Sequence, residues 1–261
     1  MKLPIFQIDA FSDKVFGGNP ACIVPLEKWL EDNILLKIAQ ENAVAETAFF
    51  VRKGKKIHLR WFTPDIEMDL CGHATLATAH CILSELKLVS EKVIFETVSG
   101  DLEVSIKNES YLMNFPRRDP QLATLPNEIK NALNIQPKEI LKSRDYLLVY
   151  ENQKEVENII INREIFDTIN INPGGVIITS KGDYYDFVSR YFTPQATILE
   201  DPVTGSAHCT LAPYWSKILN KTVMKAQQIS ERKGKLVCEL KKDSVNITGK
   251  AVTYSKGNLI I

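Results

Sequence analysis

An internal repeat constrains the fold of this chain more than any other feature of its sequence. The segment RWFTPDIEMDLCGHATLATAH (60–80) returns in altered form as RYFTPQATILEDPVTGSAHCTLAPYW (190–215). In each copy an extended segment ends in a glycine, and apolar residues at nearly helical spacing follow it. A chain whose halves repeat in this way is expected to form two lobes of similar architecture, each with one helix after the glycine.

The segments on either side of the repeated block correspond as well. Upstream, 45–64 and 174–194 each contain an apolar run rich in β-formers, a Lys-Gly turn and an alternating strand. Downstream, 99–115 and 233–249 both have the pattern of a β-hairpin. One helix among many short strands favours an α+β fold. In each of the two pseudo-symmetric lobes, a mostly antiparallel sheet or half-barrel would wrap around a central helix. Pro213 inside the second helix is expected to bend or split it.

A composition change marks the expected boundary between the lobes. Residues 118–142 are richer in Pro, Asn and Lys than the segments around them. We therefore expect an N-terminal lobe at 1–117 and a C-terminal lobe at 118–261, with the last strand, about 250–261, as a further candidate for the N-terminal lobe. The junction between two such lobes is a favoured place for a small-molecule site.

Composition argues against several classes of function. Lys plus Arg and Asp plus Glu each total 32, so the formal net charge is zero and the pI is about 6.9. No charge excess points to nucleic acid or to an anionic membrane. The five cysteines include no Cys-x-x-Cys pair and are expected to be reduced thiols. No apolar run reaches the roughly 18 residues of a membrane span. The N-terminus lacks the apolar stretch of a signal peptide, so a cytoplasmic protein is expected.

The two glycine turns are the first candidates for a binding site. Small residues after Gly72 and Gly205 leave backbone N–H groups of the first helical turn exposed, and such a helix start binds carboxylate or phosphate. A tight turn in which glycine only permits the backbone geometry would give the same pattern. The polar side chains beside the glycines differ between the copies: Cys71 and His73 in the first, and Asp201, Thr204, Ser206 and His208 in the second.

Four separated motifs carry a family resemblance. The segments FGGNPACIV, AETAFF, RWFTP with DLCGHATLATA, and EDPVTGSAH resemble, in this order, the PhzF family of phenazine biosynthesis-like proteins. That family shares its fold with diaminopimelate epimerase, and the resemblance extends from about residue 5 to the C-terminus. It implies a cofactor-independent isomerase, assembled as a homodimer, that acts on a small carboxylate-bearing substrate between its two lobes.

The resemblance also implies roles for particular residues. The general acid/base of the family falls on Glu46, and the histidine that follows the glycine falls on His73. The aspartate and the serine of the DPVTGS motif fall on Asp201 and Ser206. Asn19, in the Gly-Asn-Pro motif, is implied as a residue that binds substrate or orders its loop.

The surroundings of Glu46 in the sequence suit this role. Its neighbours Ala45, Ala48, Phe49 and Phe50 are apolar, so its carboxyl would be poorly hydrated, and poor hydration raises a carboxyl pKa towards that of a useful proton carrier. From the residues alone, a solvated glutamate at a strand edge remains the alternative.

Cys71 departs from the phenazine enzyme proper, in which this position is small and carries no thiol. It resembles instead the diaminopimelate epimerases, which use two opposed cysteines, but here the partner position is Thr204 and a two-thiol mechanism is not expected. Three functions stay open: a Glu46-dependent proton-shifting isomerase, a racemase or epimerase assisted by Cys71, and a non-catalytic protein that binds small anions.

No metal site and no organic cofactor are predicted from the sequence. The pairs His80–Cys81 and His208–Cys209 contain metal-ligand residue types, but adjacent residues of a helix point in different directions. Further ligands at suitable spacing are not evident. No phosphate loop or dinucleotide-binding motif occurs.

Overall fold

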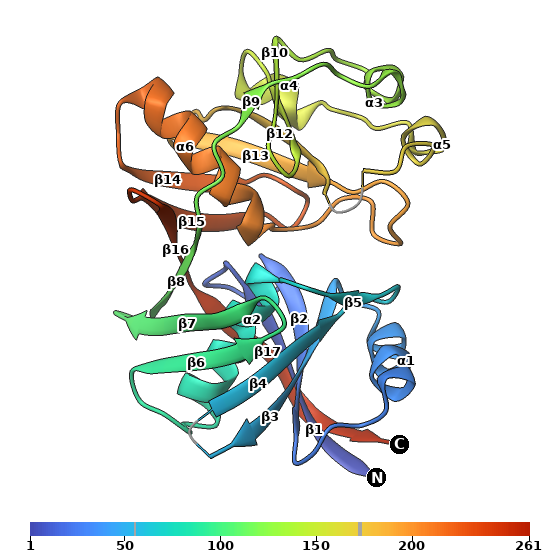
Figure 1. The fold of residues 1–261 in the computed structure, drawn as a ribbon, viewed down its shortest axis with the longest axis vertical. Coiled ribbons are helices and arrows are strands. Elements are labelled where there is room, and N and C mark those ends of the chain that lie inside the picture. The colour runs from blue at the N-terminus through green and yellow to red at the C-terminus, as the bar shows by residue number, and fades with distance from the viewer. Residues whose placement is uncertain (55, 172–173) are drawn as a thin grey trace. The chain divides into compact units, whose positions relative to one another are not determined.

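The computed structural model describes residues 1–54, 56–171 and 174–261. The fold is α+β, with many short strands and few helices (Figure 1), as the sequence predicts. None of the described helices has the length and the apolar character needed to cross a membrane.

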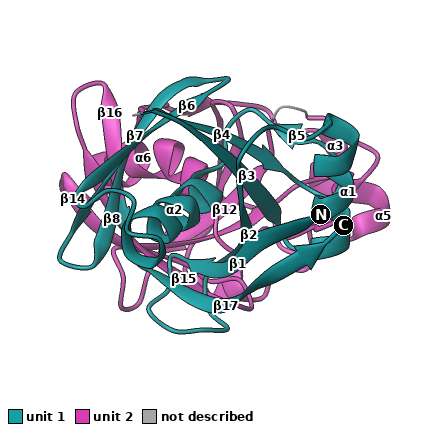
Figure 2. Cartoon of the chain, turned by 90° about the horizontal axis from the view of Figure 1, so that it is seen from below, with its two compact units in different colours: residues 1–114, 248–261 teal, residues 115–247 magenta. Residues whose placement is uncertain are grey.

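The described chain separates into two compact units (Figure 2). Unit 1 comprises Met1–Asn114 together with Thr248–Ile261, and unit 2 comprises Phe115–Ile247. The chain leaves unit 1 within strand β8 (Ser110–Pro116) and returns to it within β16 (Ser244–Gly249).

Unit 1 is built around helix α2 (Gly72–His80), which is buried from Gly72 to Ala79 and continues as a π-helix over Cys81–Glu85. A helix that is buried on all sides needs small and apolar residues all round, and the sequence GHATLATA supplies them. The strands of this unit are β1 (Lys2–Ala10), β2 (Asn19–Leu26), β3 (Glu46–Lys53), β4 (Lys56–Phe62), β5 (Glu67–Met68), β6 (Lys92–Thr97), β7 (Gly100–Lys107), β8 and β17 (Ala251–Ile260). Helix α1 (Asp32–Asn42) completes it.

The alternation of side chains along β3 determines which way Glu46 faces. Phe49 and Val51 pack with Leu35 of α1 in one apolar cluster. Because successive residues of a strand point to opposite faces, Glu46 lies on the face turned away from α1. The alternation of side chains along β3 thus places the Glu46 carboxyl on the opposite face of the sheet from the apolar cluster that packs with α1.

Unit 2 repeats this architecture around helix α6 (His208–Leu219). Its strands are β9 (Gln121–Leu122), β10 (Glu139–Lys142), β11 (Tyr146–Val149), β12 (Val176–Lys181), β13 (Phe187–Phe192), β14 (Val223–Gln228), β15 (Gly234–Leu240) and β16. Three short helices, α3 (Asn127–Ala132), α4 (Gln153–Glu157) and α5 (Arg163–Phe166), lie between them in sequence.

The two units share one order of strand pairing. In unit 1, β2 is parallel to β3, β3 antiparallel to β4, β4 parallel to β6, and β6 antiparallel to β7. In unit 2, β11, β12, β13, β14 and β15 follow the same order of parallel and antiparallel pairs. The repeat in the sequence is therefore a repeat of topology.

Helix α6 runs unbroken through Pro213, so the predicted split does not occur. Proline has no N–H to donate to the carbonyl four residues earlier, which is that of Cys209. The backbone N–H of Arg118 donates to the Cys209 carbonyl instead, at 3.1 Å. This hydrogen bond from outside the helix replaces the missing one, because buried carbonyl groups are rarely left without a donor.

The arginine of each repeated block forms the same contact in both units. Arg60 donates through Nε and Nη2 to the two carboxylate oxygens of Glu67, at 2.6 and 2.7 Å. Arg190 does the same to Glu200, at 2.7 and 2.8 Å. Each pair closes the loop that follows the strand, so the repeated Arg-aromatic-Phe-Thr-Pro motif serves to shape this loop.

Replacing Arg190 by lysine should destabilise the protein. Arg190 is largely buried and also donates to the carbonyl oxygens of Val156 and Ile159. A lysine cannot reproduce the planar fork, so we expect Arg190→Lys to lower the free energy of unfolding by about 2 kcal/mol in urea titrations. The control is Arg163→Lys, at a side chain that is 48% exposed, where the expected loss stays below about 1 kcal/mol. Equal losses at the two positions would contradict this account.

Candidate active site

Unit 1 brings four of the predicted site residues together at one end of α2. Asn19 is the first residue of β2 and Glu46 is the first residue of its parallel neighbour β3. Cys71 is the N-cap of α2, and His73 is the second residue of the helix. Two strand starts and a helix N-terminus therefore supply the side chains, which come from three separate parts of the sequence.

His73 is the centre of this group. Its Nε2 lies 2.9 Å from Oε2 of Glu46, close enough for an ion pair, although the two atoms are not aligned as a hydrogen bond. Its Nδ1 lies 3.0 Å from the side-chain amide of Asn19, whose oxygen must face the ring when Nδ1 carries a proton, and 3.6 Å from Sγ of Cys71. The side chain of His73 is 3% exposed and that of Glu46 is 13% exposed. The contact between imidazole and carboxylate is thus largely shielded from water.

The protonation of His73 depends on the anions beside it. Burial lowers the pKa of the imidazole, but the charges of Cys71 and Glu46 raise it by more, so the net pKa lies well above its ordinary value. Burial also raises the pKa of the Cys71 thiol, to about 11, so this thiol is uncharged near neutral pH. Cys71 and Glu46 both raise the imidazole pKa, and Glu46 approaches the ring more closely, with Oε2 2.9 Å from Nε2. The buried pair can exchange a proton with a third group without being hydrated.

The start of α2 is also suited to bind an anion. The N-cap Cys71 offers the first turn only a thiol, which is a weak hydrogen-bond acceptor, in place of the oxygen of a usual N-cap residue. The partial positive charge of the helix N-terminus adds to their attraction for a carboxylate. The start of α2 therefore combines the contact between Glu46 and His73 with a place suited to a negative group.

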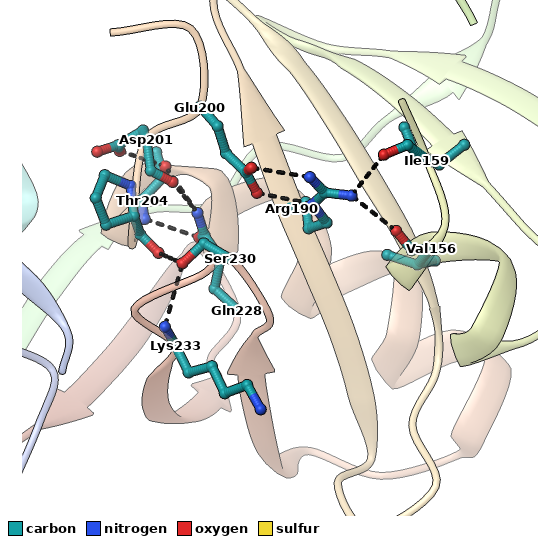
Figure 3. A network of polar contacts seen from close by, with 10 residues as sticks. Val156, Ile159, Arg190, Glu200, Asp201, Thr204, Gln228, Ser230 and Lys233 are labelled. Atoms are coloured by element: carbon teal, nitrogen blue, oxygen red, sulfur yellow. Dashed lines mark hydrogen bonds and ion pairs between the residues drawn. The ribbon is translucent and has the colours of Figure 1, made fainter. Parts of the chain in front are cut away.

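Unit 2 gathers a second group, around Asp201 and Thr204 (Figure 3). The hydroxyl of Thr204 donates to Oδ2 of Asp201. Gln228 accepts from the N–H of Thr204 at 2.8 Å and donates to the carbonyl of Asp201 at 2.7 Å. Ser230 donates to the carbonyl of Pro202 at 2.6 Å. The segment AQQIS (226–230) contains no motif that indicates a functional role for Gln228 or Ser230. Long-range strand pairing brings both residues close to Asp201.

The helix start of unit 2 differs from that of unit 1. Gly205–Ala207 forms a 3₁₀ turn and α6 begins only at His208, three residues later than the sequence predicts. The carbonyl of Thr204 accepts from the N–H of Ala207 and contacts the Nδ1 of His208 at 3.0 Å. A first turn of this tighter kind is common at helix N-termini. Ser206, which follows Gly205, is half-buried.

Strand register shows what unit 2 has in place of Glu46. Thr47 pairs with Phe62 in unit 1, and Val176 pairs with Phe192 in unit 2. The residue before each of these pairs is equivalent, so Glu46 corresponds to Gly175. A Cβ atom at Gly175 would lie 2.5 Å from Cζ of Tyr191, whose hydroxyl donates to Asp145 at 3.0 Å. Tyr191 fills the space, and unit 2 carries no carboxyl at this position.

The donor atoms of Glu46, Cys71 and His73 all lie within 4.8 Å of one another, so within the described part of the chain this group could hold a metal ion. The positive end of α2 opposes a cation there, and the pairing of His73 with Glu46 accounts for the arrangement without one. The absence of a metal stays a prediction from the sequence.

Two comparisons of the fold define the class of protein. A crystal structure of a PhzF-family phenazine biosynthesis protein from Enterococcus faecalis superposes with a TM-score of 0.94 and 42% identity, covering 100% of both chains. A hydroxyproline epimerase from Agrobacterium vitis, at 11% identity, matches with a TM-score of 0.63 over 99% of this chain and 92% of its own, which shows the shared fold alone. The architecture is that of the epimerase-like α+β proteins.

The family follows from the sequence comparisons. The profile described as phenazine biosynthesis-like protein matches residues 8–257. A protein of Pseudomonas aeruginosa named an uncharacterized isomerase is 45% identical over 260 residues, which cover 99% of each chain. The chain belongs to the phenazine biosynthesis-like (PhzF) family, a family of isomerases.

Three buried or half-buried histidines should titrate away from their ordinary pKa, one above it and two below it. The pKa of His73 is raised well above it, whereas burial lowers that of His80 and brings that of His208 to about 4. In side-chain NMR spectra, His73 should therefore remain an imidazolium through neutral pH. In Glu46→Gln the supporting anion is lost and burial dominates, so the pKa of His73 should fall. An unchanged His73 titration in this variant would show that Glu46 does not hold the proton.

Buried His208 should limit stability in acid. Its pKa is lowered in the folded state, while the unfolded chain binds a proton near pH 6.5, so the protein loses stability as the pH falls between about 6.5 and 4. His208→Asn keeps an N–H for the Thr204 carbonyl but does not titrate. Between pH 7.5 and 5, its loss of unfolding free energy should be about 2 kcal/mol smaller than that of the wild type. Parallel losses in urea titrations of the two proteins would exclude His208 as the cause.

Proposed function

We propose that this chain is a cofactor-independent isomerase of the PhzF type that moves a proton on a small carboxylate-bearing substrate. Glu46 is the general acid/base in this proposal. The observation that carries it is the buried contact of Glu46 with His73 beside a helix N-terminus. Membership of an isomerase family supports the same conclusion.

The proposed reaction begins with Glu46 as a carboxylate. It removes a proton from a carbon that the substrate's carboxylate activates, and it returns this proton to another atom of the same substrate. His73, as an imidazolium, stabilises the carboxylate before the transfer and can donate to the charge that develops afterwards. The proton passes from the substrate to Glu46 and then from Glu46 back to the substrate. The proposed reaction therefore needs no cofactor.

A single proton carrier fits the difference between the two units. Unit 1 has Glu46, whereas the equivalent position of unit 2 is Gly175, whose space Tyr191 fills. A one-carrier reaction removes and returns the proton on the same face of the substrate. Asp201, paired with the hydroxyl of Thr204, is assigned to a cationic or hydroxyl group of the substrate, and Asn19 and Ser206 are assigned to binding.

A second candidate is a racemase or epimerase that uses Cys71. The observation in its favour is the 3.6 Å contact between Sγ of Cys71 and Nδ1 of His73. Against it, burial raises the pKa of this thiol to about 11, which leaves little thiolate at neutral pH. The hydroxyl of Thr204, the residue of the second repeat that corresponds to Cys71, already donates to Asp201.

The proposal predicts hydrogen exchange that depends on Glu46. Small carboxylic and amino acids are incubated with the protein in deuterated water, and C–H exchange or isomerisation is followed by NMR. Glu46→Gln should lower the rate by at least about 100-fold, because the amide cannot accept the proton. The matched control is Glu41→Gln, at an exposed position of α1, which should keep the wild-type rate.

Cys71→Ser separates the two candidate functions in the same assay. The Glu46 mechanism predicts that this variant keeps most of its activity, and the epimerase predicts its loss together with inversion at one carbon. Full activity of Glu46→Gln would refute the proposed role of this residue. Binding of an acid without any exchange would favour a non-catalytic anion-binding protein.

A further inference from the structure

Gln228 is a buried amide that was not among the predicted site residues. It is the last residue of β14, its side chain is fully buried, and its side chain forms hydrogen bonds with Asp201 and Thr204 (Figure 3). A buried polar side chain whose hydrogen bonds all go to one short loop, here 201–204, either stabilises the fold of that loop or orients the polar groups on it.

The hydrogen bonds leave only one orientation for this amide. The N–H of Thr204 can only donate, so it must face Oε1 of Gln228, at 2.8 Å. The carbonyl of Asp201 can only accept, so it must face Nε2, at 2.7 Å. A flipped amide would place like groups against each other at both contacts.

The fixed amide also determines where the hydroxyl of Thr204 points. Nε2 of Gln228 lies 3.4 Å from Oγ1 of Thr204 and donates towards it. The hydroxyl has a single proton, and with a donor on one side this proton is directed to Oδ2 of Asp201, its other partner. The orientation of Gln228 is thereby transmitted through Thr204 to the carboxylate.

Other residues hold the same loop without touching this carboxylate. Ser230 donates to the carbonyl of Pro202, and a Cβ atom at Gly234 would lie 2.3 Å from Cγ2 of Val203. Glu200, directly before Asp201, is held by Arg190 through both carboxylate oxygens. Several contacts therefore stabilise the fold of this loop. The orientation of the Thr204 hydroxyl, in contrast, depends on Gln228.

We propose that Gln228 is a positioning residue of the isomerase, which orients the carboxylate of Asp201 by directing the Thr204 hydroxyl towards it. This inference rests on the role proposed for Asp201 in binding the substrate. It assigns to β14 a residue that acts on the reaction through two others and does not itself touch the substrate.

Gln228→Glu tests the proposal with almost no change of shape. The carboxylate still accepts from the N–H of Thr204, but it can no longer donate to the Asp201 carbonyl or to the Thr204 hydroxyl, which then turns towards residue 228. A carboxylate at this fully buried position lowers the melting temperature, so the rates are compared at a temperature where the variant is folded, and there we expect unchanged protection of the Thr204 amide in hydrogen exchange followed by NMR. We expect kcat for the acid found in the deuterium screen to fall about 100-fold, with KM altered much less.

Two further variants keep the test decisive. Gln228→Met removes every hydrogen bond at similar volume, so it should lose both the Thr204 amide protection and the turnover. Gln227→Glu is the matched control, because its half-buried side chain lies on the other face of β14, and it should change neither. Wild-type kcat in folded Gln228→Glu and Gln228→Met would overturn the proposal.

The outcome for Gln228 can be told apart from the outcome for Glu46. If the wild type turns over an acid and Glu46→Gln does not, the proposed function stands, and the rates of the Gln228 variants decide this inference alone. If no acid reacts, the proposed function fails, and a crystal structure of Gln228→Glu decides the positioning claim. Loss of the contact between Thr204 and Asp201 there would support it, and an unchanged contact would overturn it.

Discussion

The contact between His73 and Glu46, with 2.9 Å between Nε2 and Oε2, depends on burial on every side. Glu46 reaches it because β3 presents alternate residues to α1 and away from α1. His73 reaches it because α2 is built from residues small enough to be buried all round. In water the same two groups would gain little from each other. The apolar packing of unit 1 by itself lowers the imidazole pKa, and the neighbouring Cys71 and Glu46 raise it by more, so the net pKa lies above its ordinary value.

The two units show how one topology can serve two purposes. Both pair their strands in the same order, and both close the loop after the repeated motif with a bidentate Arg–Glu contact. They differ where chemistry is proposed. Unit 1 has a carboxyl at the start of β3, while unit 2 has a glycine and a tyrosine ring at the equivalent place. The shared strand order gives both units the same scaffold, and the differences at the strand starts and helix starts are consistent with the proposal that only unit 1 carries the proton.

Much of the fold was predictable because it is encoded locally. The repeated block, the alternating strands and the small residues after Gly72 each determine their structure from neighbouring residues. The motif resemblance pointed to Glu46, His73 and Asp201 for the same reason. Gln228 could not be found in this way, since its contacts cross 24 to 27 residues of chain through strand pairing. The split expected at Pro213 does not occur, and it could not be excluded from the sequence because the donor that compensates for the proline comes from a distant segment.

The hydrogen bond from the Arg118 N–H to the Cys209 carbonyl limits which residue can stand at position 118. The carbonyl of Cys209 uses only the main-chain N–H of residue 118, so the identity of that side chain is irrelevant to the bond. Any amino acid except proline can supply it, although Pro116 and Pro120 stand two residues away on either side. A proline at position 118 would remove this N–H and leave the Cys209 carbonyl without the donor that compensates for Pro213.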